Sequence, residues 1–485
     1  MRGARPGPEA TAFPDGTNAG GLYAPVVRAA VAPLWAAWEK SPYLRHLARF
    51  KRTQHRPLSE VRADQFARLK ILLDHAYSHT RFYRERMDAA GLRPGDVRGW
   101  EDLLRLPVLT KDDIRAHKDG MVADDIPKDQ LRAKKTSGST GVSLSFYVDE
   151  DSMQWKRGCA MRHDEWTGWR LGERVGAVWG NPEYKKSWRG YLRNFLLERF
   201  TYLDTLRMDD AAMLDFYRAV LRDRPTLLFG HAHSLYLFAR FLHERGLSGV
   251  RPKGIISTAM VLHDFERALV EEVFGCPVTN RYGCEEVSLI ACECREHNGL
   301  HVNMDTLVVE CLCDGRPAAP GETGALVLTD LTNYGMPFIR YLVGDTARMS
   351  ERACPCGCTY PLIESLEGRI ADYVRTPEGE FVSGISLTEN FAMVLDGVKQ
   401  LQIVQDAVDH LLFRVVRGEG EYAGLAQDIA RLVRERFGEG MRHDIEYVPS
   451  IQSESSGKYR FCVSKLPPDQ LWGAGGRAHA GEVRA

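Results

Sequence analysis

The 485-residue sequence has no uninterrupted run of about 18 apolar residues, so it predicts no membrane-spanning helix. It also lacks an excess of basic charge, because 64 lysines and arginines stand against 65 aspartates and glutamates. Proteins that bind nucleic acid or membrane surfaces generally need such an excess, so neither partner is expected. The hydrophobic content of 44% is typical of a globular protein, which we expect in the cytoplasm.

The sequence contains neither a Walker phosphate loop nor a dinucleotide fingerprint. Residues 134–143, "KKTSGSTGVS", are rich in glycine, but Val142 and Ser143 stand where the Walker pattern needs lysine followed by serine or threonine. Gly138 and Gly141 would still let backbone N–H groups approach an anion, and the flanking hydroxyls suit a polyphosphate. Taken alone, this stretch is explained equally well as a flexible surface turn.

The eleven cysteines are unevenly placed, since eight of them fall between Cys284 and Cys358. In a large intracellular chain such clustering favours a metal site over disulfides. The segments "CECREHNGLH" (292–301) and "CPCGC" (354–358) supply thiols and imidazoles at spacings that suit tetrahedral Zn²⁺. Reduced, half-buried thiols that pack as small apolar groups are the alternative.

The length predicts two or three domains. Short apolar runs such as "TLLFG" (226–230), "GIIST" (254–258), "PVTNRYG" (277–283) and "GALVLTDL" (324–331) alternate with helical periodicity. This alternation predicts an α/β fold, with mainly parallel sheets flanked by helices. We expect a flexible leader (1–45), a large body (46–366), a small mobile α+β C-terminal domain (367–466) and a disordered tail (467–485). The small domain should contain a hairpin around 406–409, a helix and the strand "DIEYV".

Five motifs occur in a fixed order: "TSGSTG" (136–141), "RYGCEE" (281–286), "FIRYLVGD" (338–345), "EGRIADYV" (367–374) and "SSGKYRF" (455–461). Together they resemble the adenylate-forming superfamily of acyl- and aryl-CoA ligases. The run "LLDHAYSHTRFYRERM" and the segment from "GLHVNMDTLVVE" to "VGD" resemble the phenylacetate–CoA ligase branch, with its CapK-like and coenzyme F390 synthetase-like members. The resemblance covers roughly residues 60–466.

The resemblance implies a role for each motif. The loop would cradle the β- and γ-phosphates of ATP through Thr136, Ser137, Gly138, Ser139, Thr140 and Gly141. Tyr282 and Gly283 would border the adenine and the acyl carbonyl, while Glu286 would hold Mg²⁺. Asp345 would accept hydrogen bonds from the ribose, and Lys458 would meet the growing charge on the carboxylate and α-phosphate. We expect Arg340 and Arg369 at phosphate or hinge contacts. Taken singly, Glu286, Asp345 and Lys458 also read as ordinary surface or turn residues.

The branch also implies the zinc ligands and the substrate pocket. Its pattern of Cys–x6–His followed by Cys–x–Cys–Gly selects Cys294, His301, Cys354 and Cys356 for a structural Zn²⁺. The pocket would draw on His231, Tyr236, Ala259 and Met260, although the histidines of "GHAHSLYLF" equally suit a neutral core. Met260 stands where typical aryl-CoA ligases carry glutamate, which puts phenylacetate itself in doubt.

The function implied is ATP-dependent activation of a carboxylic acid, aryl or related, as an acyl-adenylate. The acyl group would then pass to coenzyme A. An amine, a carrier-protein thiol, a sugar or an inorganic nucleophile are alternative acceptors, and a non-catalytic binding protein is a third reading. The expected partners are small molecules, and a homodimer is compatible with the resemblance. The C-terminal domain should alternate between two poses, one for each half-reaction.

Overall fold

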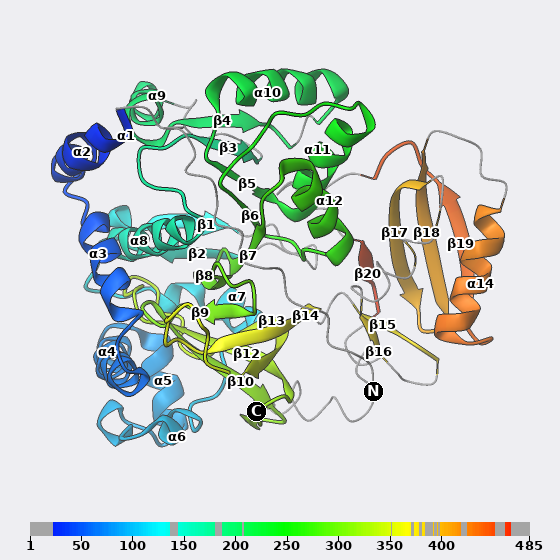
Figure 1. Ribbon diagram of the computed structural model, residues 1–485. Helices are drawn as coiled ribbons and strands as arrows, with labels where there is room; N and C mark the ends of the chain where they lie inside the picture. The colour runs from blue at the N-terminus through cyan, green and yellow to red at the C-terminus, as the bar shows by residue number, and fades with distance from the viewer. Residues whose placement is uncertain are drawn as a thin grey trace.

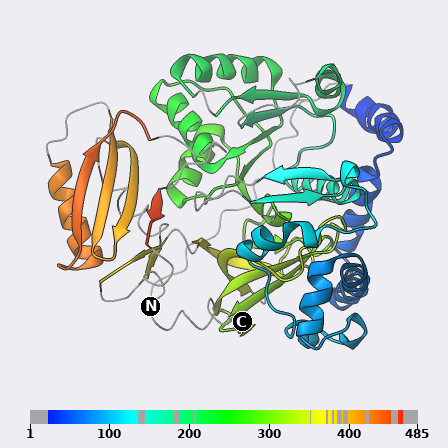
Figure 2. The same ribbon diagram turned by 180° about the vertical axis from the view of Figure 1, so that it is seen from behind.

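The structure is a computed structural model that describes residues 23–135, 144–179, 187–205, 208–350, 352–369, 373–377, 381–383, 391, 395, 398–418, 424–451 and 461–466. A large body and a small domain, drawn in dark yellow to red, lie side by side in both views (Figures 1 and 2). The α/β class and the separate small C-terminal domain are therefore confirmed. Within the described residues, no helix has the length and apolar character needed to cross a membrane.

The described part of the chain starts with a helical region that wraps one side of the body (Figure 1). Its elements are α1 (Tyr23–Val26), η1 (Val27–Val31), α2 (Ala32–Trp38), α3 (Tyr43–Thr53), α4 (Leu58–His79), α5 (Arg81–Ala89), η2 (Pro94–Asp96), α6 (Trp100–Leu103), α7 (Lys111–Met121) and η3 (Lys128–Gln130). Helix α7 begins directly after Thr110, whose hydroxyl accepts a hydrogen bond from the Asp113 N–H at 3.1 Å. A two-stranded antiparallel sheet follows, formed by β1 (Arg132–Lys135) and β2 (Ser145–Val148).

Residues 23–38 differ from the flexible leader that the sequence predicts. They form α1, η1 and α2, and Val27, Ala32 and Trp35 are buried against Val175 of the main sheet and its neighbours. These short helices are stabilised by packing of a few scattered apolar residues against the body. The hydrophobic periodicity of the segment is weak, so the sequence alone does not predict the helices. Residues 1–22 and the predicted tail, 467–485, lie outside the described residues.

The parallel part of the main sheet runs in the order β4-β3-β5-β6-β7. Its elements and the helices between them are α8 (Glu150–Trp166), β3 (Val175–Val178), α9 (Trp188–Arg193), η5 (Asn194–Glu198), β4 (Phe200–Leu203), α10 (Asp210–Asp223), β5 (Leu227–His231), α11 (Ala232–Glu244), β6 (Gly254–Thr258), α12 (Asp264–Phe274) and β7 (Val278–Cys284).

Both faces of the parallel strands are covered by helices. Leu228 and Ile255 pack against α10, α11 and α12, whereas the neighbouring Leu227 and Ile256 pack against α3 and α8 on the opposite face. Burial on both sides explains why these strands read as continuous apolar runs in the sequence. The predicted strands at 226–230, 254–258 and 277–283 are confirmed to within one residue.

The sheet continues from β7 as antiparallel strands in the order β7-β8-β9-β14-β13-β12-β10-β11. These are β8 (Ser288–Glu293), β9 (Leu300–Val302), β10 (Leu307–Cys313), β11 (Arg316–Pro317), β12 (Thr323–Asp330), β13 (Tyr341–Ser350) and β14 (Leu362–Arg369). Helices α4, α5 and α7 pack on this half through a large apolar cluster that includes Leu72, Tyr83, Ile290 and Phe338. The predicted strand "GALVLTDL" is β12 and belongs to this antiparallel half.

The small domain contains the predicted hairpin, helix and strand. Its elements are β15 (Tyr373–Arg375), β16 (Phe381–Ser383), β17 (Val398–Ala407), β18 (His410–Arg417), α14 (Leu425–Phe437), β19 (Arg442–Tyr447) and β20 (Cys462–Ser464). The four-stranded sheet has the order β19-β18-β17-β20, and α14 packs on it through Ile429 and Val433. Strand β20 pairs in parallel with β17, so it anchors the chain directly after the segment that contains Lys458.

Candidate functional site

The carboxyl ends of the parallel strands form one edge of the sheet. Register aligns His231 of β5 with Thr258 of β6, and Thr258 with Arg281 of β7. Trp179 follows β3, and the centroid of its ring lies 4.0 Å from that of the His231 ring. The Thr258 hydroxyl donates a hydrogen bond to the Arg281 carbonyl at 2.7 Å. Ligands of open α/β sheets generally bind at this edge, where the connections leave the strands.

Two tyrosine–carboxylate hydrogen bonds join the end of β7 to β13. The Tyr282 hydroxyl donates to Asp345 Oδ2 at 2.5 Å. The Tyr341 hydroxyl donates to Glu286 Oε1 at 2.8 Å. The structure therefore brings together three residues that the sequence predicts for the site, Tyr282, Glu286 and Asp345, although Asp345 is about 60 positions further along the chain.

Tyr341 is a site residue that sequence reasoning did not identify. It lies in the quoted "FIRYLVGD" segment, four residues before Asp345 on the same strand. Side chains four residues apart on a strand point to the same face, so the even spacing was the available signal. Burial raises the pKa of the Tyr341 phenol well above its usual range, and the Glu286 carboxylate raises it further. Tyr341 therefore remains a hydrogen-bond donor to Glu286.

The carboxylates of this site are withdrawn from water. Glu286 is 5% exposed and Asp345 is 7% exposed. Burial raises the pKa of the nearby Cys284 thiol, and the charge of Glu286 raises it further. A buried carboxylate is stabilised by a cation, and carboxylate oxygen is a preferred ligand of Mg²⁺. The residues present therefore fit a magnesium ion at Glu286.

Gly283 is required by the tight turn between β7 and β8. A Cβ atom at this position would lie 2.5 Å from the Ser288 carbonyl oxygen, which is far inside contact distance. The pairing of β7 with β8 also shifts register between Tyr282 and Gly283. The glycine thus allows the turn that carries Glu286 to fold back beside Tyr282.

The predicted substrate-pocket residues separate into two groups. His231, Ala259 and Met260 lie at the strand-end edge, where Ala259 follows β6 in a left-handed conformation with φ of 67°. Tyr236 lies within α11, and its ring contacts those of His233 and Phe265 at centroid distances of 5.8 and 5.4 Å. Tyr236 is therefore part of the α11–α12 layer that covers the strands.

Arg340 does not face the candidate site. Its guanidinium contacts both carboxylate oxygens of Glu310 at 3.0–3.2 Å and donates to the backbone carbonyls of Leu104 and Leu106. The residue is 3% exposed and has a left-handed φ of 54°. These contacts join β10 to the turn after α6, so a packing role replaces the predicted phosphate contact.

Three further predictions fall wholly or partly outside the described residues. The loop Thr136–Gly141 and Lys458 are not described. Strands β1 and β2 nevertheless fix the two ends of the loop segment, because Lys135 pairs with Ser145. Arg369 is opposite Asp345 in the register of β13 and β14, whereas its side chain is not described.

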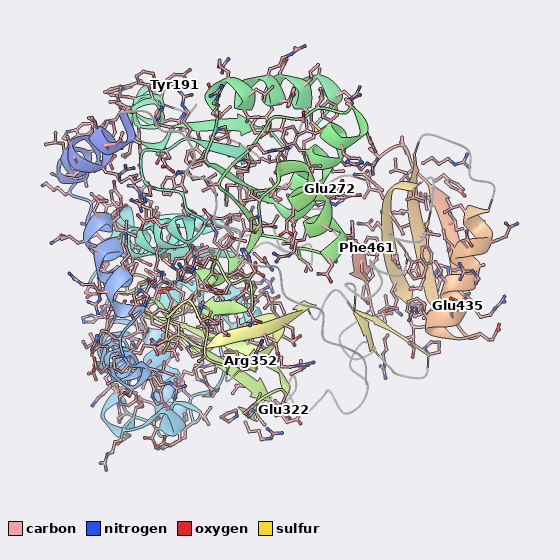
Figure 3. The ribbon with its side chains drawn as sticks, viewed as in Figure 1. Tyr191, Glu272, Glu322, Arg352, Glu435 and Phe461 are labelled. Atoms are coloured by element: carbon pink, nitrogen blue, oxygen red, sulfur yellow. The ribbon has the colours of Figure 1, made fainter. Side chains whose placement is uncertain are left out.

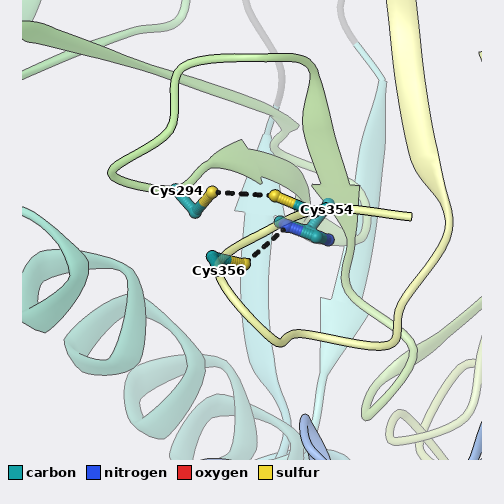
Figure 4. Close-up of side chains that lie close together, drawn as sticks. Cys294, Cys354 and Cys356 are labelled. Atoms are coloured by element: carbon teal, nitrogen blue, oxygen red, sulfur yellow. Dashed lines mark hydrogen bonds between the residues drawn. The ribbon is translucent and has the colours of Figure 1, made fainter. Parts of the chain in front are cut away.

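The four predicted zinc ligands converge, and their donor atoms lie within 4.8 Å of one another (Figure 4). Cys294 Sγ is 3.5 Å from Cys354 Sγ, and Cys356 Sγ is 3.3 Å from His301 Nε2. His301 Nδ1 lies 3.0 Å from the Tyr360 carbonyl. If Nδ1 carries the proton, it donates to this carbonyl and leaves Nε2 to bind a metal, which is the usual arrangement around ligating histidines.

The donor chemistry of this cluster fits Zn²⁺. Three thiols and one imidazole form a four-ligand set of the kind found in structural zinc sites. Burial lowers the pKa of His301, which keeps the ring neutral and able to ligate. The Cys358 N–H donates to Cys356 Sγ at 3.3 Å, a contact that would stabilise a thiolate. With all four positions supplied by the protein, such a site would be structural.

A separate surface pocket of about 580 Å³ lies beside the loop that carries Cys294 and His301. Its lining is strongly charged and includes Glu293, Glu364, Arg267 and Arg352. The pocket borders the beginning of β7 at Pro277, whereas Tyr282 and Glu286 follow from the end of that strand. It is therefore distinct from the predicted acid pocket.

The chain is similar to several known proteins. A sequence family described as CapK C-terminal domain matches residues 374–465. Protein CapK of Staphylococcus aureus is 25% identical over 369 residues, covering 75% of this chain and 80% of CapK. A phenylacetate–coenzyme A ligase of Thermus thermophilus is 29% identical over 333 residues, covering 65% of this chain and 72% of the ligase.

Among solved structures, a 2-hydroxyisobutyryl-CoA ligase in its postadenylation state, in complex with 2-HIB-AMP, superimposes with a TM-score of 0.71. The match covers 86% of this chain and 92% of the ligase, at 22% sequence identity. At this identity the likeness establishes the shared fold of body and small domain.

We predict that Glu310→Ala lowers the free energy of unfolding by about 3–5 kcal/mol, because it leaves the buried Arg340 charge without its carboxylate partner. Chemical denaturation measures the change. The matched control is Glu244→Ala, which removes a carboxylate from the more exposed Arg240–Glu244 pair on α11 and should cost about 0.3–0.5 kcal/mol. Equal losses for the two variants would contradict the packing role of Arg340.

Proposed function

We propose that this chain, an adenylate-forming ligase from the branch of CapK and the phenylacetate–coenzyme A ligases, activates a carboxylic acid with ATP and transfers the acyl group to coenzyme A. The substrate that we propose is an aryl or related acid. The observation that carries this proposal is the pair of contacts, Tyr282 to Asp345 and Tyr341 to Glu286, at the carboxyl edge of the parallel strands.

The chemistry explains why activation is needed. A carboxylate is a poor electrophile, because its charge is delocalised and oxide is a poor leaving group. In the first half-reaction a carboxylate oxygen attacks the α-phosphorus of ATP, the bond to the bridging oxygen breaks, and pyrophosphate leaves. In the second, the coenzyme A thiolate attacks the acyl carbonyl carbon and AMP leaves. The first step gives the acyl group a good leaving group, AMP, and the second step uses that leaving group to form the thioester.

The described residues would divide these tasks. Asp345 would accept hydrogen bonds from the ribose hydroxyls, and the Tyr282 hydroxyl, which donates to Oδ2, would hold the carboxylate in place. Glu286, oriented by Tyr341, would hold Mg²⁺, which screens the phosphates and stabilises the departing pyrophosphate. The neighbouring rings of Trp179 and His231 would contact the organic part of an acid, through their faces for apolar groups and through their ring nitrogens for polar ones.

The roles of the remaining predicted residues rest on the sequence motifs. Thr136, Ser137, Gly138, Ser139, Thr140 and Gly141 would cradle the β- and γ-phosphates. Lys458 would bring a positive charge to the reacting oxygens in the adenylating pose, and Arg369 would lie near the hinge between domains. The strand pairing of β20 with β17 ties the Lys458 segment to the small domain, which supports its movement with that domain. A cytoplasmic location and a homodimer stay predictions.

The direct test is pyrophosphate release across a panel of aryl and short-chain acids, with and without coenzyme A. We expect release with at least one acid and a thioester only when coenzyme A is present. Release with a stalled acyl-adenylate would assign the second step to another acceptor, such as an amine, a carrier-protein thiol, a sugar or an inorganic nucleophile. Absence of release with every acid would contradict the proposal.

The same assay tests the proposed division of labour. Lys458→Ala should abolish release, whereas preformed acyl-adenylate and coenzyme A should still yield thioester. Loss of both half-reactions to the same degree would contradict a role for Lys458 that is specific to adenylation.

A second prediction concerns the Tyr341–Glu286 contact. Tyr341→Phe keeps the ring but removes the hydrogen bond that orients Glu286, so we expect the Mg²⁺ concentration for half-maximal activity to rise roughly 10–100-fold. Glu286→Gln should have a larger effect on the same titration. Tyr191→Phe is the control, since Tyr191 is 63% exposed on α9 at the outer edge of the body (Figure 3). An unchanged Mg²⁺ requirement in Tyr341→Phe would show that this contact does not serve the metal.

We further propose that Cys294, His301, Cys354 and Cys356 bind a structural Zn²⁺. Purified protein should contain about one equivalent of zinc at this site, and Cys356→Ser should lose it together with part of the thermal stability. Cys313→Ser, which changes a cysteine of β10 outside the cluster, should keep both. Zinc retained in full by Cys356→Ser would contradict this ligand set.

A further inference from the structure

A second group of metal-ligand side chains lies far from the cysteine cluster in the sequence. It consists of His75 and His79, on the last turns of α4, and Asp125, in the loop between α7 and η3. The two histidines are four residues apart, so they share one face of the helix. Their donor atoms and the Asp125 carboxylate all lie within 4.8 Å of one another. The proposed ligase function uses none of the three.

Each histidine has one ring nitrogen near a fixed acceptor and the other turned toward Asp125. His75 Nε2 lies 3.0 Å from the Tyr334 carbonyl, while its Nδ1 is 3.7 Å from Asp125 Oδ2. His79 Nδ1 lies 2.9 Å from Asp124 Oδ1, while its Nε2 is 3.8 Å from the same Asp125 oxygen. An outer N–H held by a carbonyl or carboxylate, with the inner nitrogen free to ligate, is typical of metal-binding histidines.

The distances from each histidine to Asp125 are close to those of a filled site. Tetrahedral ligands at bond lengths of about 2.1 Å are about 3.4 Å apart. Both histidine-to-Asp125 distances exceed this value by less than half an ångström. The side chains are 13%, 37% and 39% exposed for His75, His79 and Asp125, so an ion can reach them from solvent.

Backbone contacts already hold the two halves of this group together. The Asp124 N–H donates to the His79 carbonyl at 3.0 Å, and the Ala123 N–H donates to the Gly335 carbonyl at 3.0 Å. The Asp125 loop is thus fixed against both the end of α4 and the loop that contains Tyr334. Only small side-chain movements would be needed to close the three donors around an ion.

We propose that His75, His79 and Asp125 bind a divalent transition metal, with Zn²⁺ as the natural occupant of two imidazoles and one carboxylate. The inner nitrogens and one Asp125 oxygen supply three ligands, and water completes the set. The ion pins the segment before β1, which leads into the glycine-rich loop at 136–141, to the end of α4. This inference stands independently of the proposed ligase function.

The test uses Co²⁺ and Zn²⁺ titrations of the metal-free full-length protein, with binding followed by calorimetry and by visible absorption. Co²⁺ bound by nitrogen and oxygen lacks the intense thiolate-to-metal charge-transfer bands of a cysteine site. Beyond the equivalent that the cysteine cluster takes up, we expect about one further equivalent of Co²⁺ without these bands. His79→Gln and Asp125→Asn should lose this equivalent, and Cys356→Ser should keep it. Asp124→Asn, which changes only the outer carboxylate, should weaken binding roughly 10–100-fold.

The matched control is His243→Gln. His243 Nδ1 lies 3.8 Å from a carboxylate oxygen of Glu272, which is on the surface of α12 (Figure 3). This histidine–carboxylate pair is similar, but it does not belong to either group of metal-ligand side chains among the described residues. This variant should bind as the parent does. Identical titrations and spectra for the parent, His79→Gln and Asp125→Asn would overturn the proposal and leave a cluster held by hydrogen bonds alone. Circular dichroism confirms that each variant is folded.

Discussion

The position of β13 against the turn between β7 and β8 is the constraint on which the candidate site depends. Two tyrosine hydroxyls define that position, one donating from β7 to Asp345 and the other from β13 to Glu286. In the sheet order, β8, β9 and β14 separate these two strands. The sheet must therefore curl for the contacts to form, and the Gly283 turn brings Glu286 back toward Tyr341.

The same constraint gives the site its electrostatic character. Glu286 and Asp345 are both buried, and neutral tyrosine hydroxyls donate to them. A neutral donor satisfies a hydrogen bond but adds no opposite charge, and a nearby cation lowers the cost of burying a carboxylate. A magnesium ion on Glu286 and the ribose hydroxyls of a nucleotide on Asp345 would add further stabilising contacts. The proposed function and the burial of these carboxylates thus have one physical explanation.

Much of this arrangement was predictable because the informative motifs are local in sequence. The alternating apolar runs located β5, β6 and β7, and the ordered motifs selected Tyr282, Glu286 and Asp345. The cysteine spacing likewise selected four residues that converge in space. In each case a short segment carries both the residue type and the element that positions it.

Other features depend on contacts that spacing does not encode. Arg340 sits in a quoted motif, yet its left-handed backbone and the partner Glu310 on β10 direct its side chain toward the turn after α6. Helices α1 and α2 are held by burial against the main sheet, which their own sequence signals only weakly. His79 and Asp125 are brought together by the fold across 46 positions, and no motif links them.

The most direct test of the central claim is a crystal structure of the protein with Mg²⁺ and ATP, and a second with an acyl-sulfamoyl adenosine that mimics the adenylate. We expect the ribose hydroxyls of both ligands on the Asp345 carboxylate and, with ATP, the metal on Glu286. Nucleotide bound elsewhere, with the Tyr282–Asp345 and Tyr341–Glu286 contacts unchanged and neither carboxylate in contact with ligand or metal, would contradict the proposed site.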